Sequence, residues 1–255
     1  MRLAIFVSTA MLMLAAAMPA HGQQQGSGLG EPGVGQPVAS VVELFTSQGC
    51  SSCPPADAQL RILGTRSDVL TLAYHIDYWN YLGWEDTLSS PANTARQKAY
   101  ARALERSSVY TPQAVLNGHD HINGSKGAII ERRLAWFTRE GRGLTVDVGL
   151  RHHDDTITIT VGSAPEKTGN LIFVVFDRSN SVEITRGENA GRTMVYRNAV
   201  RSYQTVGLWK GKPLQVDLPA TLLSDWDRQG CAVILQATAN EAGDPGAILG
   251  AAVLR

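Results

Sequence analysis

The chain has 255 residues, with 23 basic and 23 acidic side chains, 44% hydrophobic residues and three cysteines. This length suffices for one large or two modest domains with a buried core, and the ordinary hydrophobic content excludes a chain that is disordered throughout. A formal charge of zero excludes a strong global field for nucleic acid or an anionic membrane, and three cysteines are too few for a disulfide scaffold. We therefore expect a globular protein with no nucleic-acid partner.

The N-terminus has the pattern of a secretory signal. Arg2 precedes an apolar run, and the small residues Ala20 and Gly22 form the exit that a signal peptidase recognises. We assign residues 1–22 to a signal peptide and residues 23–37, rich in Gly, Gln and Pro, to a flexible leader. The mature protein is then periplasmic or secreted, and no later segment is apolar for long enough to form an integral membrane span.

Between residues 38 and 142, patterns typical of strands and helices alternate. Short apolar runs predict buried strands, and prolines after cysteine or serine predict helix starts. The expected elements are a strand at 41–45, a helix from Pro54, a strand at 69–76, a helix from Pro91 with alanines on one stripe, strands at 113–116 and around Ile122, and a helix from Ser125. We therefore predict a β-α-β-α-β-β-α domain at residues 38–142.

After Gly143 the hydrophobic period changes to two. Apolar residues alternate with polar residues or glycine at 144–150 and at 157–161, which predicts half-buried paired strands. Further strands are expected at 171–176, 194–206, 214–218, 232–237 and 247–254. No strong helical period follows, so we predict an all-β sandwich-like domain, or a barrel, at residues 143–255.

Cys50 and Cys53 form a Cys-x-x-Cys motif between a buried strand and a helix start. A helix N-terminus stabilises a thiolate, and two intervening residues let the sulfurs cycle between dithiol and disulfide. Cys50 is expected to attack a substrate disulfide and Cys53 to resolve the mixed intermediate. Glu43, on the preceding strand, is the candidate proton acceptor for Cys53. Thr111-Pro112 is a candidate cis-proline bond that would hold an extended peptide beside the pair.

Two resemblances follow from these motifs. Residues 38–140 resemble the thioredoxin fold, with CSSC in the redox-motif position and TP in the cis-proline position. The segments VVELFTSQGCSSCPPAD, HIDYWNYLGW, SSVYTPQAVLNG and RGENAGRTMVYRNAV are similar to a secreted bacterial family catalogued as domain of unknown function 1223. The resemblance implies a thioredoxin-like domain joined to a β-rich one, and it implies no substrate.

Three aromatic residues, Tyr78, Trp79 and Trp84, follow a strand end on the cysteine side of the predicted sheet. Because ligands gather at the carboxyl ends of parallel strands, these rings are candidates for a substrate groove. Packing at the interface between the two domains is the alternative. Cys231 begins an apolar strand and is expected to be a buried, inert thiol.

The remaining arginines and histidines have simpler explanations than a binding or metal site. The arginines at positions 186, 192, 197 and 201 suggest a basic patch, but Glu183 and Glu188 lie close to them in the sequence, which indicates a solvated or interdomain face. His75, His119 and His121 are possible partners of the thiols in copper handling, but zinc sites need four ligands and no second Cys-x-x-Cys exists. We therefore predict no metal site and no cofactor.

The sequence thus favours an exported thiol-disulfide oxidoreductase-like or redox-sensing protein, with protein thiols or disulfides as partners. Two alternatives stay open at this point. One is a non-catalytic binding module with a structural disulfide, and the other is metal handling. Whether the chain is an enzyme, and its oligomeric state, are also open.

Overall fold

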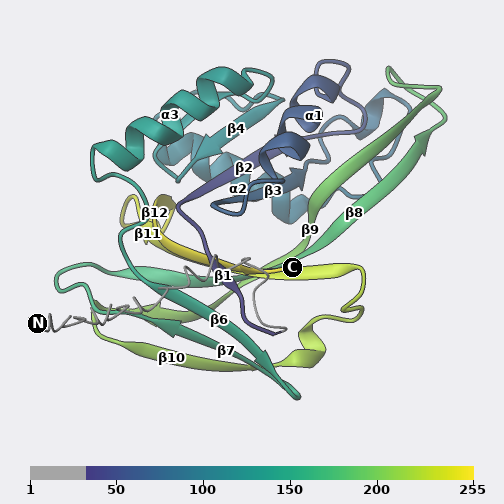
Figure 1. Cartoon of the computed structure of the whole chain (residues 1–255). Coiled ribbons are helices and arrows are strands. Elements are labelled where there is room, and N and C mark those ends of the chain that lie inside the picture. The colour runs from purple at the N-terminus through teal and green to yellow at the C-terminus, as the bar shows by residue number, and fades with distance from the viewer. Residues whose placement is uncertain (1–32) are drawn as a thin grey trace, which may run out of the picture.

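The first half of the chain alternates strands with helices (Figure 1). A computed structural model describes residues 33–255, so the predicted signal peptide at 1–22 and most of the predicted leader lie outside the described residues. The elements of this half are β1 (Gln36–Pro37), β2 (Ser40–Thr46), α1 (Pro54–Leu63), β3 (Val69–His75), the 3-10 helix η1 (Asn80–Leu82), α2 (Pro91–Ala103), β4 (Gln113–Leu116), β5 (Asp120–Asn123) and α3 (Gly127–Arg139).

The second half consists of strands with one short 3-10 turn. Two of its strands, β8 and β9, are much longer than the others and form one antiparallel hairpin. The elements are β6 (Val148–His153), β7 (Thr156–Val161), β8 (Gly169–Ile184), β9 (Arg192–Trp209), β10 (Leu214–Pro219), η2 (Ala220–Leu222), β11 (Gln229–Thr238) and β12 (Pro245–Leu254).

The strands of both halves join in one mixed sheet of nine strands, in the order β1-β12-β11-β8-β9-β3-β2-β4-β5. The junction is the parallel pairing of Ala73 in β3 with Ala199 in β9, and Asn198 reinforces it by donating to the Thr71 carbonyl over 2.8 Å. The prediction of a thioredoxin-like α/β domain followed by a separate β sandwich is therefore wrong. The protein is mostly β, and its largest sheet runs through both halves.

A shared hydrophobic core explains why the sheet is continuous. Apolar side chains from β2 and β3 pack into the same cluster as side chains from β8, β11 and β12. Its members include Phe45, Leu72, Tyr74, Val174, Ile234 and Val253. Separating the halves would expose this surface to water, which costs about 25 cal/mol for each Å² of apolar area.

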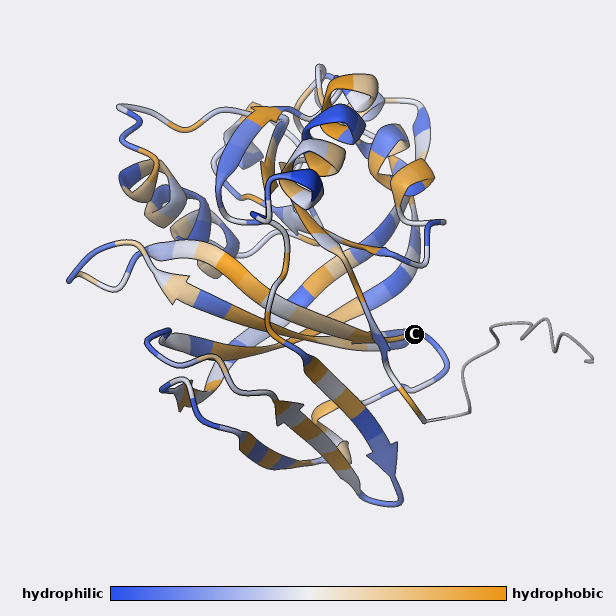
Figure 2. Cartoon of the chain, turned by 60° about the vertical axis from the view of Figure 1, so that its left-hand side comes forward, coloured by the Kyte–Doolittle hydropathy of each residue, from blue (hydrophilic) through white to orange (hydrophobic). Residues whose placement is uncertain are grey.

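A second sheet of three strands, in the order β10-β7-β6, covers one face of the β8-β11-β12 region. Its strands alternate apolar and polar residues, which Figure 2 shows as orange and blue bands. The inward residues Ile157 and Ile159 pack with Phe173, Val233 and the indole of Trp209. The period of two in the sequence thus places one apolar face of this small sheet against the large one.

Helices lie on both faces of the first-half strands. On one face α1 and α3 contribute Ala56, Leu60, Ile130 and Leu134 to an apolar core. On the other face α2 begins at its N-cap Ser90, whose side chain accepts from the backbone of Asn93. The buried residues of α2 are mostly polar, namely Asn93, Thr94, Arg96, Gln97, Tyr100 and Ala101. The helix therefore brings hydrogen-bonding groups into the interior, while two of the four alanines of its stripe are exposed and the other two half-buried.

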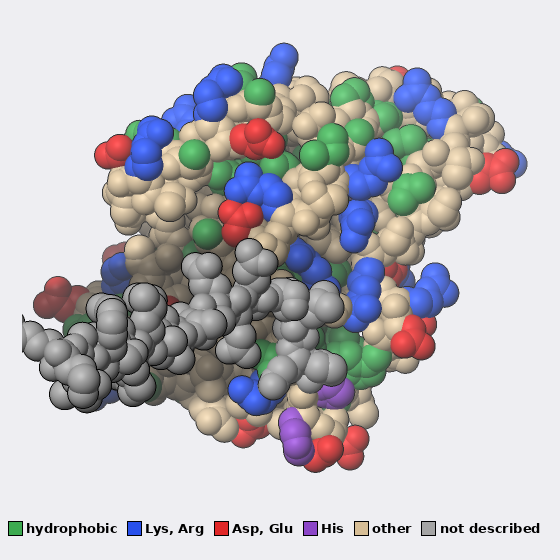
Figure 3. All heavy atoms as spheres, viewed as in Figure 1, with side chains coloured by type: hydrophobic (Ala, Val, Ile, Leu, Met, Phe, Trp, Pro, Cys, Tyr) green, Lys and Arg blue, Asp and Glu red, His purple; other side chains and the backbone are tan. Residues whose placement is uncertain are grey.

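The surface carries both signs of charge. In Figure 3, Lys and Arg side chains are spread over the visible face with Asp and Glu among them. Arg201, from the arginine series of β9, lies 3.7 Å from Asp177, and Arg66 pairs with Asp68 at 2.7 Å. Within residues 33–255, no helix combines the length and the apolar character needed to cross a membrane.

Candidate functional site

The Cys-x-x-Cys motif lies between strand β2 and helix α1. Every residue of β2 is buried, and the chain then turns so that Cys53 becomes the N-cap of α1, with Pro54 and Pro55 in the first helical turn. Proline suits these positions because their N–H groups have no partner within the helix. Cys50 and Cys53 form a disulfide at this point. Only 2% of Cys50 and none of Cys53 is exposed.

The bond between Thr111 and Pro112 is cis, as the sequence predicts. Thr111 Oγ1 donates a hydrogen bond to Cys50 Sγ over 3.3 Å, and Trp79 Nε1 donates to Thr111 Oγ1 over 2.8 Å. Three of the predicted substrate-binding residues, Thr111, Pro112 and Trp79, are therefore gathered beside the first cysteine.

The other two aromatic candidates make no hydrogen bond to the disulfide among the described residues. Trp84 donates from Nε1 to the side-chain oxygen of Gln48, two residues before Cys50, over 2.8 Å. Tyr78 is half-buried, and this burial raises the pKa of its hydroxyl to about 12. Tyr81, which the sequence analysis did not select, is 77% exposed and stacks on the Trp79 ring at a centroid distance of 6.4 Å. Its only sequence signal is its place in the aromatic segment after β3.

Glu43 lies on the face of the sheet opposite to Cys53. Its neighbours Val42 and Leu44 pack with α1, so the alternation of the strand turns Glu43 towards α2. There Arg96 Nε lies 2.7 Å from Glu43 Oε1, and the Tyr100 hydroxyl donates to the other carboxylate oxygen. The expectation that Glu43 accepts the Cys53 proton thus conflicts with its position, because period-two geometry separates it from α1.

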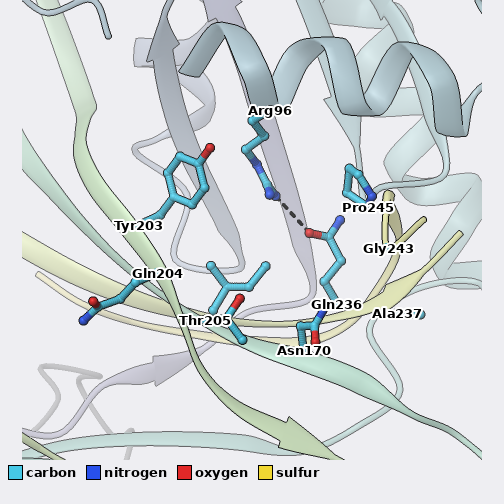
Figure 4. A pocket seen from close by; sticks show the side chains of 10 residues that line it. Arg96, Asn170, Tyr203, Gln204, Thr205, Gln236, Ala237, Gly243 and Pro245 are labelled. Atoms are coloured by element: carbon cyan, nitrogen blue, oxygen red, sulfur yellow. Dashed lines mark hydrogen bonds between the residues drawn. The ribbon is translucent and has the colours of Figure 1, made fainter. Parts of the chain in front are cut away.

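The ion pair of Glu43 and Arg96 is buried, with only 6% of the Arg96 side chain exposed. The Arg96 guanidinium lies 5.1 to 5.5 Å from three tyrosine rings and donates to Gln236 Oε1 over 3.0 Å. Figure 4 shows Arg96 reaching from the helix towards Gln236, beside the ring of Tyr203. These residues also border a cavity of about 270 Å³. Because β11 supplies Gln236, the contact ties α2 to the second half of the chain.

A different carboxylate lies on the face of Cys53. Asp57 follows Cys53 by one helical turn, its N–H donates to the Cys53 carbonyl over 3.1 Å, and its Oδ1 accepts from Thr46 over 2.7 Å. Burial raises the pKa of Asp57 to about 7, against the attraction of His75, which lowers it. Residues one turn apart on a helix share a face, so Asp57 lies on the face of α1 that begins at Cys53.

Asp57 belongs to a buried network with His75 and Asp86. His75 Nδ1 lies 2.8 Å from Asp86 Oδ2, which also accepts the N–H of Gln48 over 2.8 Å. Burial opposes both charges, but mutual attraction outweighs it, so the pKa of His75 is raised and that of Asp86 is lowered. In the described part of the chain, Asp57 Oδ2 and His75 Nε2 are buried without a hydrogen-bond partner. The network thus has unused capacity for a proton.

The tip of the β8–β9 hairpin, residues 185–191, reaches the loop between β2 and α1, residues 47–53, which we call the Cys50 loop. Asn189 Nδ2 donates to the carbonyls of Gln48 and Cys50 over 2.9 and 3.0 Å, and Glu188 Oε2 accepts the N–H of Ser51 over 3.2 Å. The charge pattern of the sequence favours a solvated or interdomain face for this segment, whereas the structure places it against the Cys50 loop. Its one sequence signal is that RGENAGRTMVYRNAV is among the segments that carry the family resemblance.

The remaining candidate residues lie apart from the disulfide. His121 contacts the Tyr110 hydroxyl through Nδ1 over 2.8 Å, and His119 stacks on Phe137. No group of three His, Cys, Asp or Glu side chains within residues 33–255 is placed to hold a metal ion. Cys231 is a free, buried cysteine, and burial raises the pKa of its thiol to about 12.

Comparison with known proteins identifies a family and two similar solved structures. A family model described as "Protein of unknown function (DUF1223)" matches residues 41–236. The crystal structure of protein AGR_C_4864 from Agrobacterium tumefaciens is similar with a TM-score of 0.79 and 47% identity, covering 85% of this chain and 94% of that one. HBP35 of Porphyromonas gingivalis has a TM-score of 0.62 at 15% identity, covering 86% and 75%, which is a likeness of fold alone. No curated protein matches.

Proposed function

Since the chain belongs to a family of proteins of unknown function, DUF1223, we propose from the geometry of its site that it is an exported protein whose Cys50–Cys53 pair exchanges with thiols and disulfides of other proteins. The observation that carries the proposal is the contact of Cys50 Sγ with Thr111 Oγ1, in a Cys-x-x-Cys pair whose second cysteine is the N-cap of α1. The signal-like segment at residues 1–22 supports export to the periplasm or beyond.

The exchange takes place in two displacements. The Cys50 thiolate attacks a substrate disulfide, which forms a mixed disulfide and releases one substrate thiolate. The Cys53 thiolate then attacks Cys50 Sγ, releases the second substrate thiolate and restores the Cys50–Cys53 bond. Two electrons pass from the cysteine pair to the substrate. The positive end of the helix dipole at the start of α1 favours the thiolate forms.

Asp57 takes the role that the sequence analysis gave to Glu43. Before Cys53 can attack, its thiol must lose a proton, and a carboxylate with a pKa near 7 is suited to take it up at neutral pH. The unpaired Oδ2 of Asp57 is the accepting atom, and His75 lies close enough to stabilise the charge before transfer.

The burial of the disulfide favours a second candidate function. With 2% of Cys50 exposed, the bond would serve as a structural staple in a binding module. Equilibration of the oxidised protein with glutathione buffers, followed by trapping of thiols, separates the two candidates. A structural disulfide resists reduction down to about −300 mV or below, whereas an exchanging pair equilibrates above that potential.

A trapping experiment tests the exchange directly. The Cys53→Ser variant should accumulate mixed disulfides through Cys50 when it is incubated with periplasmic extract, because the resolving thiol is gone. Cys50→Ser is the matched control and should accumulate far fewer, since Cys53 is fully buried. Equal and negligible trapping by both variants would refute the exchange and favour the structural disulfide.

A further inference from the structure

We propose that the hairpin tip (residues 185–191) selects the substrates of the disulfide: it shields Cys50 from folded protein surfaces and leaves cysteines in extended peptide segments a path over Thr111 and Trp79. This inference rests on the thiol–disulfide exchange proposed above and names the class of partner. The far ends of β8 and β9 carry the tip to the α/β layer, as Figure 1 shows.

The tip binds the main chain on both sides of the attacking sulfur. The side chain of Asn189, which is only 1% exposed, donates to the carbonyl of Gln48 over 2.9 Å and to the carbonyl of Cys50 over 3.0 Å. Glu188 accepts the N–H of Ser51 at 3.2 Å. A polypeptide that approached from this direction would have to displace all three hydrogen bonds.

The tip also closes against the aromatic segment after β3. Gly187 has a φ of +76°, and a Cβ atom built on it would lie 3.1 Å from Cβ of Trp84. Trp84 in turn bonds the side chain of Gln48. The tip, the aromatic segment and the Cys50 loop therefore pack together around Cys50, which is 2% exposed.

The other neighbours of Cys50 Sγ are side chains that reach the surface. Cys50 Sγ contacts Ser52 Oγ at 3.4 Å and Thr111 Oγ1 at 3.3 Å, and Ser52 itself is exposed. Beyond Thr111 lies the half-buried Trp79 with the exposed Tyr81 ring stacked on it. An extended segment is narrow enough to follow these side chains, and an aromatic side chain beside its cysteine can stack on Tyr81. A folded surface is broad and would meet the tip first.

The test measures how fast three thiols reduce the oxidised full-length protein. The thiols are mercaptoethanol, an unstructured decapeptide with Phe next to its single Cys, and a folded protein domain with one exposed Cys. Each rate is divided by the rate of the same thiol with oxidised glutathione, which removes differences in intrinsic thiol reactivity. The wild type should favour the peptide over the folded domain by at least about tenfold, as expected if displacing the tip costs more than one neutral hydrogen bond.

Two variants weaken the contact between the hairpin tip and the Cys50 loop. Of two further variants, one is a control and the other tests the proposed path of the peptide. Asn189→Ala, which removes two hydrogen bonds, should raise the normalised rate of the folded domain by about tenfold and leave the peptide rate within about twofold. Glu188→Gln, on an exposed side chain, is the milder version and should act in the same direction. Asn180→Ala is the control, because its side chain bonds only Asp177 lower in the same hairpin. Tyr81→Ala should slow the peptide and spare mercaptoethanol.

The outcomes separate the two proposals. Equal normalised rates of peptide and folded domain in the wild type would overturn the selection, and so would an Asn189→Ala variant that accelerates all three thiols alike. If none of the thiols reduces the disulfide in any variant at potentials down to about −300 mV, the exchange itself is refuted rather than the selection.

Discussion

Replacing Asp57 by Asn should abolish a large part of the pH dependence of stability. The carboxyl is buried on α1, bonded by Thr46 through one oxygen and unpaired at the other. Asparagine has nearly the same shape, keeps an oxygen for Thr46 and carries no charge at any pH. The substitution therefore isolates the effect of ionising this one group.

The magnitude follows from the pKa of Asp57, which burial raises from 3.8 to about 7. Because the folded state holds this proton more tightly than the unfolded chain, its contribution to stability is complete below pH 3.8. It is then lost as the pH rises towards 7. At 1.36 kcal/mol for each tenfold change in proton affinity, the loss is up to about 4 kcal/mol. The Asp57→Asn variant should gain on the wild type by this amount between pH 4 and pH 8.

Urea unfolding at several pH values, followed by tryptophan fluorescence without reductant, measures this difference. Asp227→Asn is the matched control, because Asp227 is exposed in the turn before β11 and its substitution should leave the difference from wild type constant. A difference between the Asp57→Asn variant and the wild type that stays flat within about 1 kcal/mol from pH 4 to pH 8 would show that Asp57 is not held protonated by burial.

Three further predictions concern other parts of the molecule. Arg96→Met strands the Glu43 carboxylate in the interior and should reduce the free energy of unfolding by about 3–5 kcal/mol, whereas adding Glu43→Gln should recover most of it; urea unfolding of both variants decides. Cys231 should stay unlabelled by a thiol reagent at pH 8 until the protein unfolds, because its thiol is buried with a raised pKa; labelling of the native oxidised protein would contradict this. Residues 143–255 expressed alone should lack a cooperative thermal transition in calorimetry, since one of their cores is completed by β2 and β3; a sharp transition would show an independent domain.

Local features of the sequence anticipated much of the secondary structure and the centre of the site. The prolines after Cys53 start a helix, the period-two segments after Gly143 form strands, and the bond before Pro112 is cis. Each of these depends on a residue and its near neighbours, such as the missing N–H of proline or the alternation of a pleated strand. Such signals can be read along the chain without knowing what lies across from it.

The placement of acids and partners could not be read in that way. Period two says that Glu43 and its neighbours point to opposite faces of β2, but only the packed structure decides that α1 covers the neighbours and α2 covers Glu43. The same holds for α2, whose polar face is buried because buried partners such as Glu43 receive it. Asp57 looks like an ordinary polar helix residue until Thr46 and His75 enclose it.

By itself, the sequence determined where the disulfide forms, which helix begins beside it and that the Thr111–Pro112 peptide bond is cis, because these are local properties of cysteine and proline spacing. The tertiary structure alone decided that both halves share one sheet through Ala73 and Ala199, and that Asn189 closes over Cys50 from a hairpin 139 residues further along the chain. Contacts of that range depend on which surfaces bury together, and burial is a property of the whole folded chain.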